Sequence, residues 1–261
     1  GFMSVYLSSV NREVLIPSTT TLLFLVYGGD SGTTFLEGAK ITASGSDGKT
    51  YSGTTGQDGV VRLDVPLGQS YNYEITADGY LSASGETDVI SDIKSISVTL
   101  EKGVEVTVAV RENTASGSPV SGAKVTAENG SVKVTGTTNT QGNAVLTIKS
   151  GSNIFTVEKS GYENTVHSDY VTSTKTITLS LKKIYSALNV QVRRVGQMQG
   201  MPSQIQLKDS TGLEVIQTKN ITTTVTFANV AYGQYILYVP EGDFSKETSQ
   251  SITVNSEGMQ V

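Results

Sequence analysis

The chain of 261 residues has no cysteine and no tryptophan, and its only histidine is His167. Without cysteine, neither disulfides nor thiolate metal sites can form. A Ser-His-Asp triad would have to use His167, which lies in the polar stretch 163–169, where we expect a surface loop. No Gly-x-Ser-x-Gly motif is present. The sequence therefore predicts no enzyme, and no catalytic, cofactor-binding or metal-binding residue.

Charge and long apolar runs are also scarce. Charged residues make up 16% of the chain and the net charge is −5, whereas a nucleic-acid partner requires a clustered basic face. The longest apolar run covers residues 22–27, far short of the roughly 20 residues that span a bilayer. No signal peptide is visible. Either an export signal preceded Gly1, or Met3 is the natural start, as would suit a phage structural protein.

The sequence is rich in Thr, Ser, Gly and Val, and alternation with period two is its dominant pattern. Val104, Val106, Val108 and Val110 alternate with other residues, as expected for a half-buried strand. No segment shows a sustained helical stripe. The pattern predicts an all-β protein.

Short motifs occur twice in the same order. Residues 38–43 (Gly-Ala-Lys-Ile-Thr-Ala) recur as residues 122–127 (Gly-Ala-Lys-Val-Thr-Ala), 84 positions later. A period of about 80 residues exceeds the roughly 20–50 residues of a solenoid unit. It indicates a series of small, complete domains.

Two glycine motifs follow the same period. Asp58-Gly59 and Gln141-Gly142 suit the positive φ of tight hairpin turns, and Gly-Tyr pairs occur at 79–80 and 161–162. We expect structural turn or core roles for Gly59, Gly142, Gly79, Tyr80, Gly161, Tyr162, Gly233 and Tyr235. Tyr73 is also expected in the core, because it recurs at a strand position.

The repeat divides the chain into an N-terminal arm and three β-sandwiches. The predicted ranges are 1–20, 21–102, 103–183 and 184–261, the last more diverged. In the third unit we expect Ile252 and Val254 in the last strand, and Phe244 in the place of Tyr80. The short links predict an elongated, stiff rod.

The arm has no counterpart in the repeat. Its apolar residues Val5, Leu7, Val14 and Ile16 could pair with the first unit or with another chain. The arm is thus a candidate contact for self-assembly.

The series 119–125, 138–144 and 159–163 resembles the carboxypeptidase-regulatory-like module, and 225–239 resembles collagen-adhesin B-type repeats. This resemblance implies prealbumin-like, Ig-like Greek-key sandwiches of about seven strands that act as spacer or adhesive modules. The Lys of the internal Lys–Asn bond of B-type repeats has no counterpart in the first strands here, and no sortase motif is present. Neither covalent cross-linking nor anchoring is therefore implied.

Three functions remain open. The first is a non-enzymatic stalk or adhesive segment, extracellular or on a cell surface, that binds a protein or a cell-surface glycan. The second is a virion component such as a tail, baseplate or decoration protein. The third is a carbohydrate-binding accessory module, for which the candidate aromatic residues are Tyr51, Tyr170, Tyr185 and Tyr232. For Asp30, Asp47 and Asp58, turn formation explains the residues better than calcium binding.

Overall fold

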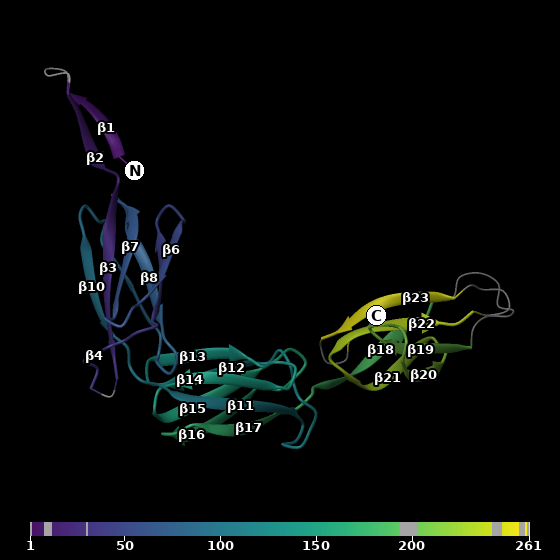
Figure 1. Cartoon of the computed structure of the whole chain (residues 1–261). Helices are drawn as coiled ribbons and strands as arrows, with labels where there is room; N and C mark the ends of the chain where they lie inside the picture. Colours follow the sequence, from purple (N-terminus) through teal and green to yellow (C-terminus); the bar gives the residue numbers. More distant parts are fainter. Residues whose placement is uncertain are drawn as a thin grey trace.

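The computed structural model describes residues 2–7, 12–29, 31–193, 203–241, 247–255, 259 and 261. These residues form strands and connecting turns and contain no helix, which confirms the all-β prediction. They build three β-sandwiches in succession, with a hairpin ahead of the first (Figure 1). Phe244 lies outside the described residues.

Sandwich 1 contains two facing sheets. Its strands are β3 (Thr19–Gly28), β4 (Thr34–Phe35), β5 (Lys40–Gly45), β6 (Thr50–Thr54), β7 (Val60–Pro66), β8 (Tyr71–Thr76), β9 (Ala83–Glu86) and β10 (Lys94–Thr99). Strand β3 pairs antiparallel with β7 and parallel with β10, and the other sheet has the order β6-β5-β8-β9. The first and last strands of the sandwich are therefore direct neighbours.

Sandwich 2 repeats this topology. Its strands are β11 (Val104–Glu112), β12 (Lys124–Asn129), β13 (Val132–Thr137), β14 (Asn143–Ile148), β15 (Gly151–Glu158), β16 (Thr165–Val171) and β17 (Lys175–Leu181). One sheet has the order β14-β11-β17, with β11 and β17 parallel, and the other has the order β13-β12-β15-β16. The polar stretch 163–169, expected as a loop, contains most of β16, so His167 lies within a strand.

Sandwich 3 keeps the four-stranded sheet and changes the other one. Its strands are β18 (Tyr185–Gln191), β19 (Gln204–Asp209), β20 (Val215–Asn220), β21 (Thr224–Ala231), β22 (Gly233–Val239) and β23 (Thr248–Val254). The larger sheet has the order β20-β19-β22-β23, and β18 pairs with β21.

The prediction that Ile252 and Val254 lie in the last strand of this unit is confirmed, but this strand does not take the place beside the first strand that β17 takes in sandwich 2. They lie in β23, which occupies the edge position that β16 occupies in sandwich 2. On the side of β18 away from β21, the described residues Met259 and Val261 form backbone hydrogen bonds with this strand. The N–H of Asn189 donates to the carbonyl of Met259 (2.8 Å), and the N–H of Val261 donates to the carbonyl of Asn189 (2.9 Å).

Each sandwich buries its own core between its two sheets. In sandwich 2, alternation places Val106, Val108 and Val110 inside, against the other sheet. In sandwich 1 the fully buried tyrosine is Tyr71, whereas Tyr73, which we expected in the core, is only half-buried. The Tyr71 hydroxyl donates to the carbonyl of Pro66 (2.7 Å), so its polar end is satisfied inside the core.

The three sandwiches are strung out along the chain and do not fold back on one another (Figure 1). Sandwich 1 and sandwich 3 lie at opposite ends, and sandwich 2 joins them. The strands of sandwich 1 run across the direction of those of sandwich 2, so the elongated molecule bends at that junction.

The arm forms a hairpin of two strands, β1 (Phe2–Leu7) and β2 (Arg12–Pro17). Strand β1 pairs antiparallel with β2, from Phe2 opposite Pro17 to Leu7 opposite Arg12. Pairing with sandwich 1 starts only at Thr19, the first residue of β3, two residues before the expected boundary. Among the described strand pairings, β1 and β2 pair with each other and with no strand of sandwich 1.

Candidate functional site

The two Gly-Tyr motifs lie where one sandwich passes into the next. Tyr80 forms an isolated bridge with Lys102, and Tyr162 forms the corresponding bridge with Lys183. In each case the turn is closed by the tyrosine N–H, which donates to the carbonyl three residues earlier at 3.1 Å. Gly79 and Gly161 have φ values of +80° and +85°, which glycine adopts without steric cost.

The backbone bonds of the two junctions are the same. At the first, the N–H of Gly103 donates to the carbonyl of Gly79 (2.8 Å). At the second, the N–H of Ile184 donates to the carbonyl of Gly161 (2.9 Å). Each bond ties the residue that enters the next sandwich to the Gly-Tyr turn of the preceding one. The links between sandwiches are therefore short, and main-chain hydrogen bonds also hold them in place.

The tyrosine side chains are half-buried and use their hydroxyls differently. The Tyr80 hydroxyl accepts a hydrogen bond from the N–H of Gly29 (2.9 Å), and its ring lies so close to Gly28 that a Cβ there would be 2.8 Å from it. The Tyr162 hydroxyl donates to the carboxylate of Glu112 (2.8 Å). The first bond is neutral, and the second has a charged acceptor.

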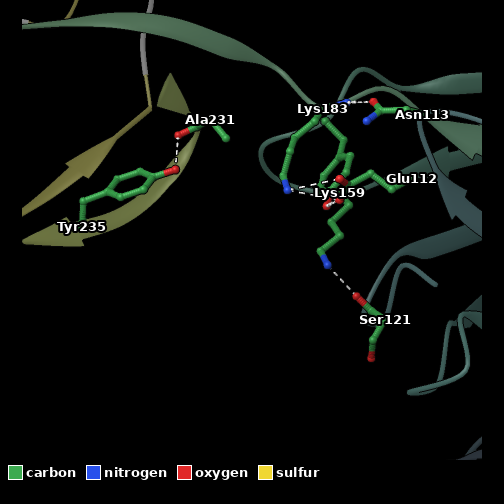
Figure 2. A network of polar contacts seen from close by, with 8 residues as sticks. Glu112, Asn113, Ser121, Lys159, Lys183, Ala231 and Tyr235 are labelled. Carbon is green, nitrogen blue, oxygen red and sulfur yellow. Dashed lines mark hydrogen bonds and ion pairs between the residues drawn. The ribbon is translucent and has the colours of Figure 1, made fainter. Parts of the chain in front are cut away.

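A charged network of Glu112, Lys159 and Lys183, shown in Figure 2, lies around the Tyr162 side chain. Glu112 ends β11, and its carboxylate lies 3.1 Å from the ammonium of Lys183. The Lys159 ammonium donates to the carbonyl of Ser121 (2.6 Å). Both ammonium groups also lie over the Tyr162 ring, that of Lys159 5.5 Å and that of Lys183 6.0 Å from its centroid.

The backbone after Glu112 supports this network. Asn113 has a φ of +61°, its N–H donates to the carbonyl of Leu181, and its side-chain oxygen accepts from the N–H of Lys183. The end of β11 is thereby fastened to the chain leaving β17 (Figure 2).

The network shifts the pKa values of its members. The hydrogen bond from Tyr162 lowers the pKa of Glu112, and Lys183 acts in the same direction. Burial raises the pKa of Tyr162 to about 12, and the Glu112 carboxylate adds to this effect. At neutral pH the site holds an ionised carboxylate and a neutral phenol, in the arrangement of a structural clamp.

Sandwich 3 also contacts the second junction, through Tyr232. The N–H of Tyr232 donates to the carbonyl of Ile184 (3.0 Å), and the backbone oxygen of Tyr232 would lie 3.2 Å from a Cβ at Gly161. The second junction is thus packed from both sides. At the first, an ion pair of 3.2 Å between Glu101 and Lys149 joins the sandwiches.

The remaining predicted turn and core residues lie within single sandwiches. Gly59 and Gly142 have φ values of +66° and +71°, and their carbonyls accept from the first strands at Val26 and Val110. Gly233 begins β22 and does not have a positive φ. Tyr235, on the same strand, donates from its hydroxyl to the carbonyl of Ala231 (2.7 Å), as Figure 2 also shows.

Sequence reasoning missed two buried polar residues that hold the chain just before β5 and just before β12. A buried threonine repeats in the first two sandwiches: Thr55 accepts from the N–H of Ala39, and Thr138 accepts from the N–H of Ala123. The fixed spacing of 83 residues between the two threonines is a signal that could have identified them. Glu112 offered no such signal, since its network exists at one junction only.

The other candidates are distributed over the molecule. Asp47 and Asp58 each accept from the backbone N–H two residues later, as in an Asx turn, while Asp30 lies outside the described residues. No group of three or more His, Asp or Glu side chains among the described residues is placed to hold a metal ion. Tyr51 and Tyr170 belong to different sandwiches, so they cannot share one sugar platform.

No protein-family model and no curated protein matches the chain. The solved structures similar to it include the Bacillus anthracis TIE protein, with 17% identity, a TM-score of 0.45, and coverage of 96% of this chain and 52% of that one. Also similar is GBS52, the minor pilin of Streptococcus agalactiae, with 13% identity, a TM-score of 0.32, and coverage of 69% and 100%.

A further similar structure is BcpA, the major pilin subunit of Bacillus cereus, with 10% identity, a TM-score of 0.27, and coverage of 93% of this chain and 97% of that one. The chain spans about half the length of the TIE chain. The described residues include no helix long and apolar enough to cross a membrane. The resemblance to carboxypeptidase-regulatory-like and B-type modules stays a prediction.

Proposed function

We infer that the chain is a non-enzymatic structural segment of a surface protein, a stalk that holds a binding surface away from its point of attachment and carries tension along its length. The observation that supports this most directly is the repeated junction, in which main-chain bonds from Gly103 to Gly79 and from Ile184 to Gly161 continue one sandwich into the next. Links of this kind transmit orientation and force between domains.

The strand order of sandwich 2 suits a load-bearing role. The chain enters it at the start of β11 and leaves it at the end of β17, and these two strands are parallel neighbours over seven residue pairs. Pulling the chain ends apart therefore shears the ladder, so all of its hydrogen bonds resist at once. In sandwich 1, β3 and β10 are parallel neighbours in the same way, over six pairs.

Single-molecule force spectroscopy tests the load-bearing role. Because the chain has no cysteine, handles can be attached at chosen positions. Pulling on the chain ends loads β11 and β17 in shear. Pulling between cysteines introduced at Glu105 and Thr174, which flank the first pair of that ladder, Val106 opposite Lys175, peels the strands apart one bond at a time.

We expect sandwich 2 to unfold at a several-fold higher force when it is pulled by the chain ends. Equal forces in the two directions would overturn the proposed load path. As a control, two cysteines are placed on β12 and β13, which pair with each other away from that ladder. The force that separates these two strands should not depend on whether the β11–β17 ladder is strained.

A further inference from the structure

Strand β16 forms an edge of the four-stranded sheet of sandwich 2. It pairs with β15 over seven residues without a bulge, and its other side pairs with no strand among the described residues. It contains no lysine and no proline, which commonly protect such edges. In Figure 1 it lies on the side of sandwich 2 away from sandwich 1.

Apolar side chains gather on the outer face of this edge. Val166 is 66% exposed and Tyr170 is 69% exposed, and Ile154 on the neighbouring strand β15 is 48% exposed. The register places Ile154 opposite Ser168, between Val166 and Tyr170, so the three belong to one patch. An exposed apolar patch along an open edge indicates an interaction surface.

The edges in the corresponding positions of the other sandwiches differ. Strand β9 in sandwich 1 has four residues, and β23 in sandwich 3 presents serine and threonine on its exposed face. The patch is therefore particular to sandwich 2 and is not a general consequence of the fold.

The sequence of β16 is complementary to itself about Ser168. Its residues read Thr-Val-His-Ser-Asp-Tyr-Val from 165 to 171. In an antiparallel pair of two copies centred on Ser168, residue 166 faces residue 170 and residue 167 faces residue 169. Each Val166 would then meet the Tyr170 of the other copy, and each His167 would meet an Asp169.

Both kinds of contact are favourable across antiparallel strands. Aromatic side chains pair well with β-branched ones, and opposite charges pair well when they are directly opposed. Within its own chain Asp169 already accepts an ion pair from Lys175 (2.6 Å), which keeps the carboxylate ionised.

We propose that two copies of this chain associate through antiparallel pairing of their β16 strands about a two-fold axis at Ser168. The pairing joins two four-stranded sheets into one sheet of eight strands and covers Val166 and Tyr170 in both copies. The occupant is a second copy because the charge and side-chain pattern of the edge matches itself under this operation. The contact is separate from the junctions that carry the load.

A single introduced cysteine tests the geometry. The two-fold axis places the residues at 168 opposite each other, with Cα atoms roughly 4.5–5.5 Å apart, within disulfide range. We expect Ser168→Cys to form an interchain disulfide under mild oxidation. Ser251→Cys is the matched control, because Ser251 is exposed at the corresponding position of β23, opposite Ile236.

Charge exchange tests the pairing independently. At a pH below about 6, where an ordinary histidine is protonated, His167→Asp places aspartates opposite each other and Asp169→His places two cations opposite each other, so each should weaken dimerisation about ten-fold in sedimentation equilibrium. The double exchange restores opposite charges and should recover most of the affinity. Far-UV circular dichroism melts show whether each variant is folded.

Removing the apolar contact gives a third test. Tyr170→Lys should weaken the dimer, whereas Leu213→Lys, at an 89% exposed residue of sandwich 3, should leave it unchanged. The proposal is overturned if the unmodified chain stays monomeric across the concentration series and Ser168→Cys cross-links no faster than Ser251→Cys. A dimer that withstands Tyr170→Lys and both charge changes would also overturn it.

Discussion

The hydroxyl of Tyr162 donates a 2.8 Å hydrogen bond to the carboxylate of Glu112, a residue 50 positions earlier in the chain. This bond joins the last residue of β11 to the turn between β15 and β16, and Lys183 completes the cluster from the link that leaves sandwich 2. The repeat places Tyr162 at the second junction. Glu112, which holds it there, is not part of the repeat.

Tyr162→Phe should lower the free energy of unfolding of sandwich 2 by about 1.5 kcal/mol, because it deletes a hydrogen bond to a charged group. Tyr80→Phe is the matched change at the first junction, where the hydroxyl accepts from a neutral backbone N–H, and it should cost about 1 kcal/mol in sandwich 1. Urea denaturation followed by hydrogen exchange resolves the two sandwiches. A Tyr162→Phe protein as stable as the unmodified chain would contradict the assigned bond.

Glu112 should make the second junction sensitive to acid. Its pKa is lowered in the folded state, so its contribution to stability is complete above the unfolded pKa of about 4.3 and is lost as the pH falls through the folded pKa. We expect Glu112→Gln to be less stable than the unmodified chain at neutral pH. The difference should shrink on acidification, and a constant difference between neutral and strongly acidic pH would argue against this linkage.

Two tyrosines should make the protein sensitive to alkali. The pKa values of Tyr71 and Tyr162 are raised to about 12, mainly by burial. Stability from these phenols is complete below the unfolded value of about 10 and is lost as the pH rises through about 12. A titration followed by tyrosinate absorbance counts the tyrosines that ionise only near pH 12. The double variant Tyr71→Phe/Tyr162→Phe should have two such tyrosines fewer than the unmodified chain. Titration of all tyrosines near pH 10 in the folded protein would refute the assignment.

Gly161→Val and Gly79→Val separate backbone strain from packing. Both glycines have a positive φ, so each change should cost at least about 1 kcal/mol in stability. At Gly79 no atom lies within 4 Å of an added Cβ, whereas at Gly161 the backbone oxygen of Tyr232 would lie at 3.2 Å. Gly161→Val should therefore cost more and also loosen the second junction. Small-angle scattering would report a broader distribution of shapes for that variant alone.

Deleting residues 1–17 should leave the melting temperature of sandwich 1 unchanged. The reason for expecting a donated strand was that the arm had no partner of its own, and β1 has one in β2. The deletion keeps Thr19, where pairing with β7 begins. A clear fall in the melting temperature would show that the hairpin packs against sandwich 1, and a change in mass would restore the arm as an assembly contact.

Much of the architecture can be read from local patterns. Alternation in segments such as Val104–Glu112 predicts strands and their buried face, because a strand buried on one side must place apolar residues at every second position. Alternation predicts strands less well at the edges of a sheet. His167 lies in a strand whose outer face is largely free of packing, so its residues carry no clear alternation and the segment reads as a loop.

The sequence by itself determined the strand content, the repeat and the glycines whose turns require a positive φ, because each depends on neighbouring residues and on a period visible along the chain. Only the tertiary structure decided which distant groups meet. It brought Glu112 to Tyr162, placed residues 259 and 261 beside β18 with β23 at the sheet edge, and left β16 as an open edge. These outcomes depend on sheet order and register, which arise from packing across the whole sandwich.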